Sequence, residues 1–75
     1  MVTYLTYTDS NNSYPKKLDL PVVPAEGNTF NISETIVDES GSSYDAFTAF
    51  TVLDVTFDFN TTTKEMTAGL LLEPQ

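Results

Sequence analysis

Carboxylates dominate the chemistry that this 75-residue chain could perform. It has eleven Asp and Glu residues against three Lys and Arg residues, and it has neither His nor Cys. His is the side chain best suited to proton transfer near neutral pH, and Cys is the best nucleophile, so catalysis lacks its usual groups. Asp54 and Asp58 share one face of an expected strand, but four strand residues span about 13 Å. Because catalytic carboxylate pairs in glycoside hydrolases are roughly 5 to 10 Å apart, we predict that the chain is not an enzyme.

A second group of oxygen ligands lies in residues 38–45, where Asp38, Glu39 and Asp45 are accompanied by serines. Hard oxygen ligands on a flexible loop are what Ca²⁺ prefers. An EF-hand loop, however, needs Gly at its sixth position and Glu at its twelfth, and counting from Asp38 places Ser43 and Ala49 there. We therefore predict no metal and no other cofactor.

The carboxylates with the clearest pattern lie in two apolar runs, residues 47–59 and 65–73. Odd-numbered positions of the first run are mostly apolar and include Phe57 and Phe59, which is the period-two signature of a half-buried strand. A loop over residues 60–63 would place Phe57 opposite Met66, Val55 opposite Ala68 and Leu53 opposite Leu70. The opposite face would then carry Asp54, Thr56 and Asp58 with Glu65 and Thr67, and would set Asp58 against Glu65.

This polar face suggests a partner, because the net charge of −8 repels nucleic acids and anionic membranes and attracts basic proteins. Alternate strand residues stand about 6.8 Å apart, which is of the order of the charge spacing along a nucleic-acid backbone. We therefore expect a small acidic inhibitor or adaptor that mimics nucleic-acid charge and occupies a basic, nucleic-acid-binding site on a protein target. The competing interpretation is that the acids only keep a small apolar domain soluble.

A further apolar set points to another class of function. Phe50, Val52 and Leu71 fall on the nominal outer face of the hairpin, and tyrosines such as Tyr44 are favoured at interfaces. The alternative is thus a structural or assembly protein, of the capsid or tail type, that forms homo-oligomers through a second apolar face. A sugar- or peptide-binding module that uses exposed tyrosines is a third reading. The predicted partner-binding residues are Asp54, Thr56, Asp58, Glu65, Tyr44 and Phe50.

The rest of the chain supplies the elements that must position these residues. Residues 2–8 and 29–37 read as strands, and residues 9–13 as a turn that makes a hairpin of the first two strands. A strand over residues 17–22 should lie at a sheet edge, because prolines flank and interrupt it. Residues 43–50 could instead form one short helical turn, since Ser42 and Asp45 resemble a helix start; a bulge or helical turn before Phe50 would divide a strand that is otherwise unusually long.

We predict a single all-β domain over residues 1–75, a small antiparallel sheet of about five strands that is sandwich-like or barrel-like. A 75-residue chain without Cys buries a small core and has no disulfide to support it, which favours close packing or a partner. No run approaches the roughly 18 apolar residues of a membrane span, and no signal-peptide pattern opens the chain. We therefore expect a cytoplasmic location and no membrane partner.

Overall fold

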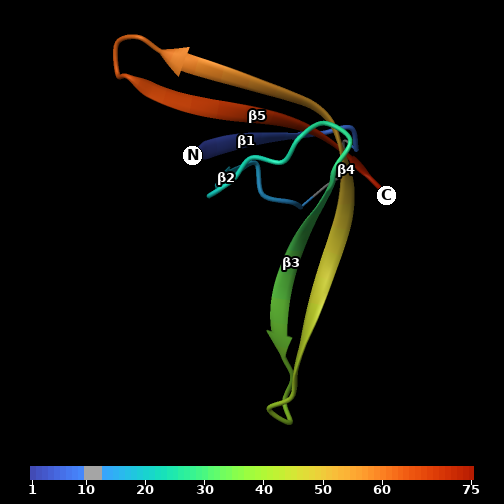
Figure 1. Ribbon diagram of the computed structural model, residues 1–75. Coiled ribbons are helices and arrows are strands. Elements are labelled where there is room, and N and C mark those ends of the chain that lie inside the picture. Colours follow the sequence, from blue (N-terminus) through green and yellow to red (C-terminus); the bar gives the residue numbers. More distant parts are fainter. Residues whose placement is uncertain (10–12) are drawn as a thin grey trace.

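The computed structural model describes residues 1–9 and 13–75, and within them it contains five strands and no helix (Figure 1). The all-β prediction and the number of strands are thus confirmed. The helical turn considered for residues 43–50 is wrong, because these residues begin the longest strand. The strands are β1 (Val2–Tyr7), β2 (Lys17–Asp19), β3 (Thr29–Val37), β4 (Ser43–Asn60) and β5 (Glu65–Pro74).

All five strands form one curled sheet in the order β2-β1-β5-β4-β3. Three of the four pairings are antiparallel, but β1 runs parallel to β5, from Val2 opposite Thr67 to Tyr7 opposite Leu72. The prediction of a purely antiparallel sheet is therefore wrong, and the first strand lies inside the sheet beside the last one. This non-local pairing joins the two ends of the chain.

The expected hairpin of the first two strands is present, and β2 lies at the sheet edge as predicted. The turn predicted for residues 9–13 lies largely outside the described residues. β2 is shorter than the predicted strand over residues 17–22. It pairs with β1 as far as Asp19, and the Leu20 amide then donates to the Met1 carbonyl oxygen at 2.9 Å. Pro21 follows, and proline has no backbone donor to continue the ladder.

The β4–β5 hairpin closes over residues 61–64, one residue later than predicted. The Asn60 side-chain oxygen accepts hydrogen bonds from the amides of Thr62 and Thr63, and the Lys64 amide donates to the Asn60 carbonyl oxygen at 2.8 Å. Every pairing consequently moves by two residues, so that Phe57 lies opposite Ala68. A shift of two preserves which face each side chain occupies. The predicted contact of Asp58 with Glu65 is wrong, because Asp58 lies opposite Thr67.

A bulge between Val52 and Asp54 reverses which face of β4 is buried. The extra residue changes the parity, so Phe50 and Val52 point into the core before the bulge and Val55 points there after it. Phe47 falls on the other face and is 65% exposed, while Phe50 is 0% exposed. The prediction that Phe47 is buried and Phe50 lies outside is therefore wrong. The expected division of the long strand is present, but it follows Phe50.

The core occupies one face of the sheet near the crossing of β1, β5 and β4. Its buried hydrophobic cluster is made of Leu5, Tyr7, Phe50, Val52, Leu70 and Leu72. The rings of Tyr7, Tyr14 and Phe50 form a triangle with centroids 5.0 to 5.3 Å apart, a spacing at which aromatic pairs attract each other. The Tyr7 hydroxyl donates to the Pro15 carbonyl oxygen, which ties the segment after β1 to the core.

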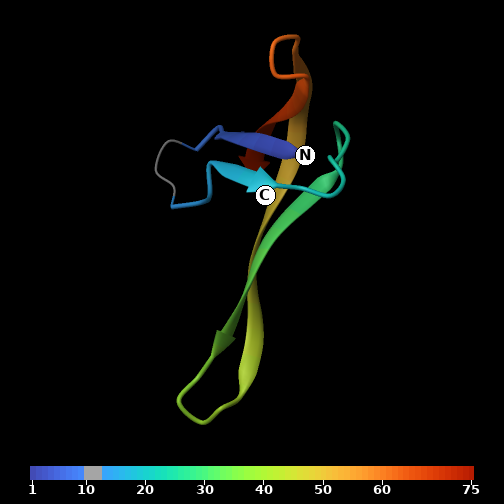
Figure 2. The same ribbon diagram turned by 90° about the vertical axis from the view of Figure 1, so that its left-hand side faces the viewer.

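Beyond this core the molecule extends into two arms (Figures 1 and 2). One arm is the β3–β4 hairpin, the other is the β4–β5 hairpin, and β4 runs through both. The radius of gyration is 14.7 Å, whereas a compact domain of this length has about 11 Å. A large share of both arms is therefore not covered by the rest of the chain.

Candidate functional site

Four of the six predicted binding residues lie on one face of the β4–β5 arm. Residues paired across neighbouring strands share a face of the sheet, and the structure pairs Asp58 with Thr67 and Asn60 with Glu65. Asp54, Thr56, Asp58 and Glu65 are all exposed there, and Thr67 is half-buried between them. We call these five residues the acidic face. The structure thus places the predicted carboxylates and hydroxyls together, in contact with solvent.

Tyr4 is a central residue of this region that the sequence pattern did not reveal. Tyr4 is half exposed and lies on β1 opposite Gly69. Three shallow hollows, of about 320, 220 and 350 Å³, are each lined by Tyr4 together with residues of the acidic face. Gly69 has no side chain, so Thr56 can lie over it. Only the parallel pairing of β1 with β5 brings Tyr4 here, and that pairing has no local signal in the sequence.

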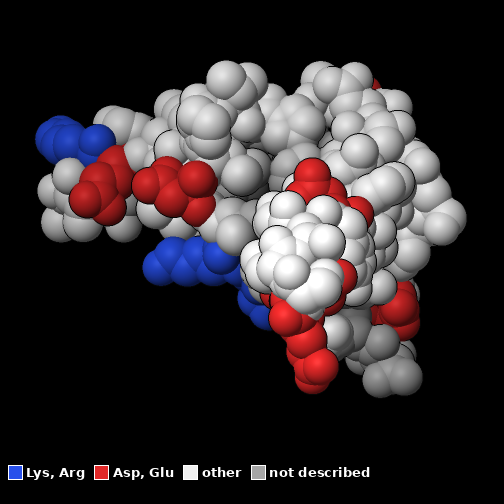
Figure 3. Space-filling view, turned by 90° about the horizontal axis from the view of Figure 1, so that it is seen from below, with Lys and Arg blue, Asp and Glu red and all other residues white. Residues whose placement is uncertain are grey.

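The acidic face has no internal neutralisation among the residues that the structure describes. Among the described residues no ion pair joins Asp54, Asp58 or Glu65 to a basic group, and the N-terminal ammonium group pairs with Asp19, outside the acidic face, at 3.0 Å. The Lys17 ammonium lies 5.7 Å from the centroid of the Tyr4 ring, beside the face. Figure 3 shows lysine side chains in separate places, at the left end of the molecule and near its centre. The face therefore presents a net negative field.

The carboxylates of residues 38–45 have a structural role in their own loop. One Asp38 oxygen accepts hydrogen bonds from the Ser40 amide, the Ser40 hydroxyl and the Ser42 amide. The hydrogen bond from the Ser40 hydroxyl, with smaller contributions from loop amides, lowers the pKa of Asp38. The Thr35 hydroxyl donates to Asp45 at 2.7 Å. In the described ranges, no group of three or more His, Cys, Asp or Glu side chains converges on a position that could hold a metal ion.

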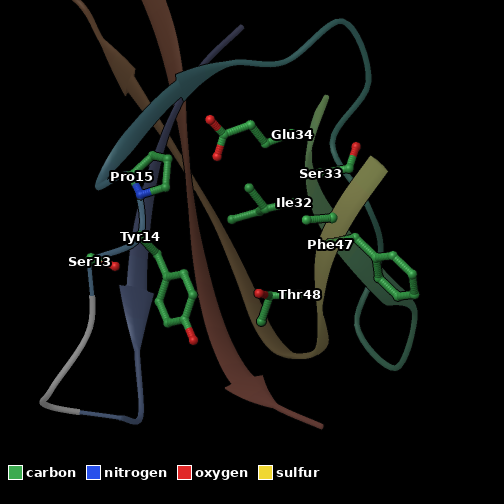
Figure 4. A pocket seen from close by; sticks show the side chains of 9 residues that line it. Ser13, Tyr14, Pro15, Ile32, Ser33, Glu34, Phe47 and Thr48 are labelled. Atoms are coloured by element: carbon green, nitrogen blue, oxygen red, sulfur yellow. The ribbon is translucent and has the colours of Figure 1, made fainter. Parts of the chain in front are cut away.

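A cleft larger than these hollows, about 470 Å³, lies elsewhere, between residues 13–15 and the β3–β4 arm (Figure 4). Tyr14 and Pro15 face Ile32, Glu34 and Thr48 across it. Glu34 is the single carboxylate in its lining, and none of the six predicted binding residues lines it. The described lining of this cleft mixes apolar side chains with the hydroxyls of Ser13, Ser33 and Thr48, and it carries one acid.

The two aromatic residues in the predicted set are not part of the acidic face. Phe50 is fully buried in the core, so the prediction that it contacts a partner is wrong for the folded chain. Tyr44 is exposed, but it lies near the tip of the β3–β4 arm opposite Ile36. The second apolar surface expected from Phe50, Val52 and Leu71 is absent as well, because Phe50 and Val52 face the core while Leu71 lies opposite Asp54 on the acidic side.

None of the described residues belongs to a helix of the length and apolarity that crossing a membrane requires. Function must be inferred from the geometry of this chain, because comparison with known proteins supplies no relative from which a role could be transferred. No protein-family model, no curated protein and no solved structure matches it.

Proposed function

We propose that this chain is a non-enzymatic protein-binding module whose acidic face occupies a basic, nucleic-acid-binding surface on another protein. The observation that carries the proposal is the exposed row of Asp54, Thr56 and Asp58 on β4, with Glu65 beside it on β5 and no ionic partner for its carboxylates among the described residues. A basic surface that normally contacts phosphates would find carboxylate and hydroxyl acceptors at strand spacing, about 6.8 Å between alternate residues.

Tyr4 supports the proposal because it adds an apolar anchor to the charges. Binding surfaces combine a central aromatic or Arg residue with a polar rim, and tyrosine supplies a large ring with a polar tip. Tyr4 lies between the row on β4 and Lys17 on β2, and it borders hollows that include Asp54, Asp58 and Glu65. A long basic side chain of a partner could place its methylene groups against the ring and its charge near the carboxylates.

The overall charge would act at longer range. A net charge of −8 on 75 residues attracts a basic protein before contact and speeds their association. This attraction is screened by salt, because the Debye length falls from about 10 Å at 0.1 M to about 3 Å at 1 M ionic strength. Complexes formed through the acidic face should therefore weaken strongly as the salt concentration rises.

In the experiment that tests the proposal, host proteins are first bound to a heparin column and eluted at high salt. These basic proteins are then passed over the immobilised chain. We expect retention of specific proteins at low salt, release at high salt, and displacement by duplex DNA or RNA. The Asp54→Asn, Asp58→Asn double variant should weaken binding at least about tenfold, which corresponds to about 1.4 kcal/mol. Both side chains are exposed, so the variant should fold normally.

A matched control separates the face from net charge alone. Glu26→Gln with Glu39→Gln removes the same two charges from exposed loop positions outside the acidic face. This control should keep most of the affinity. The proposal is wrong if the two double variants weaken binding equally, or if the Asp54 and Asp58 variant binds as tightly as the wild type.

A further inference from the structure

The inner face of the β4–β5 arm continues the hydrophobic core beyond the part that the chain itself covers. Val55 lies opposite Leu70 at the edge of the core, Phe57 lies opposite Ala68, and Phe59 lies opposite Met66, so all of these side chains share one face. We call Phe57, Phe59 and Met66 the apolar arm face. Their exposed fractions are 59%, 52% and 46%. Three large hydrophobic side chains thus lie side by side in solvent.

This surface differs from the acidic face in carrying no carboxylate. From Asp54 to Ala68 the acids of the arm are Asp54, Asp58 and Glu65, and alternation along the strands directs all three to the opposite side. A basic partner is therefore attracted to the acidic face and gains no charge contact at the apolar arm face. What covers the apolar arm face must itself be apolar.

The amount of exposed surface matches what one copy contributes to a stable dimer. The accessible surface is 5318 Å², whereas a compact protein of 8.3 kDa exposes roughly 4,600 Å². The excess of about 700 Å² is close to the roughly 800 Å² that each partner buries in an interface of standard size. Both extended arms contribute to this excess, and the apolar arm face is the part of it that continues the core along the β4–β5 arm.

We infer that a second copy of this chain covers the apolar arm face, giving a two-fold symmetric dimer. In such an interface the same patch occurs on both sides, so Phe57, Phe59 and Met66 of one copy would pack against the same residues of the other. Packing face to face leaves both acidic faces pointing away from the interface, so the net charge of −8 per copy is not brought together at the contact. The patch that the second copy presents is itself apolar and carries no carboxylate, as the surface requires.

Pairing through strand edges is disfavoured by the positions of the acids. β3 pairs with β4 only between Ser43 and Thr51, so the same edge of β4 is open from the bulge to Asn60. An antiparallel pairing of two such edges centred on Thr56 would set Asp54 of each copy directly across from Asp58 of the other. Like charges in this position repel, and acids on an edge strand oppose edge association. Edge pairing in this register is therefore unfavourable, and the proposed contact is the apolar arm face.

The test is the molar mass of the full chain, measured by sedimentation equilibrium and by light scattering after size exclusion. We expect a mass twice the 8.3 kDa of one chain, with dissociation only on dilution. Phe57→Ser with Phe59→Ser should raise the dissociation constant at least about thirtyfold, because centrally placed aromatic residues dominate interfaces. Phe57→Leu with Phe59→Leu keeps an apolar surface and should retain the dimer, and circular dichroism verifies that each variant is folded.

The matched control changes two aromatic residues on the other arm. Tyr44→Ser with Phe47→Ser alters side chains that are just as exposed but lie outside the apolar arm face, so the dimer should persist. High salt should leave the dimer intact or strengthen it, since screening weakens the repulsion between copies; binding through the acidic face has the opposite salt dependence. The inference is overturned if the wild-type chain has the mass of a monomer or of an oligomer larger than a dimer. It is also overturned if the serine variant at Phe57 and Phe59 still dimerises, or if the control variant does not.

Discussion

Thr56 and Gly69 lie directly across from each other on β4 and β5, and the Thr56 hydroxyl occupies the space where a side chain of residue 69 would stand. A Cβ atom built on Gly69 would come within 2.8 Å of Thr56 Oγ1, which is closer than such atoms approach in folded proteins. The glycine therefore leaves room for the Thr56 hydroxyl, in the same hollows that Tyr4 lines. This contact links the stability of the arm to the shape of the proposed binding surface.

Gly69→Ala should consequently destabilise the chain, although alanine usually favours a strand over glycine. Overpacking at a tight contact costs about 1 to 3 kcal/mol, and we expect a loss of free energy of unfolding in that range, measured by urea denaturation. Adding Thr56→Ala to Gly69→Ala removes the clashing hydroxyl and should restore most of the loss. If the two substitutions simply add, the contact between them does not determine the effect.

The bulge between Val52 and Asp54 predicts that two phenylalanines three residues apart contribute very differently to stability. Phe50→Ala should cost about 3 to 5 kcal/mol, because it removes a fully buried ring from the centre of the core. Phe47→Ala should change stability by less than about 0.5 kcal/mol, because its ring lies on the exposed face. Denaturant unfolding of both variants measures the difference. Equal costs, or a larger cost at Phe47, would place the parity change of β4 elsewhere.

Tyr7 gives the chain a dependence of stability on alkaline pH. Burial, together with the nearby Tyr14, raises the pKa of Tyr7 above the ordinary value of 10.0. A group whose pKa is higher in the folded state contributes stability that is fully present below the unfolded pKa and is lost as pH rises through the folded pKa. The free energy of unfolding should therefore decline above about pH 10.

Tyr7→Phe provides the corresponding comparison. It cannot ionise, so the decline above pH 10.0 should become shallower. At neutral pH it should cost about 0.5 to 1.5 kcal/mol, because the Pro15 carbonyl oxygen loses its hydrogen-bond donor. An unchanged slope in alkaline solution would show that other groups control it.

The sequence predicted features that depend on neighbouring residues and missed those that depend on distant ones. The strand over residues 29–37 has the predicted bounds, and the alternation after Leu53 correctly placed Asp54, Thr56 and Asp58 on one face. The hairpin register was off by two residues because a two-residue shift leaves the alternation unchanged.

The features that were missed have physical reasons of their own. The bulge reverses the alternation, and no residue type in the apolar run of β4 marks its position. Phe50 was therefore assigned to the outside although it is the centre of the core. The parallel pairing of β1 with β5 joins segments more than sixty residues apart, and it is this pairing that brings Tyr4 to the acidic face. Local patterns carry no information about such a contact.

Lys64 closes the β4–β5 hairpin in a backbone conformation that L-residues seldom adopt. Its φ angle is 63°, in the left-handed region, where a side chain costs about 1 to 2 kcal/mol relative to glycine. Lys64→Gly should relieve this strain, but it also adds freedom to the unfolded chain that costs roughly 0.5 to 1 kcal/mol. The net effect is a gain of up to about 1.5 kcal/mol in the free energy of unfolding. Thr63→Gly in the same loop, where φ is not positive, should only destabilise. Urea denaturation of the two variants compares them, and a loss of stability in Lys64→Gly as large as that in Thr63→Gly would contradict this account of the turn.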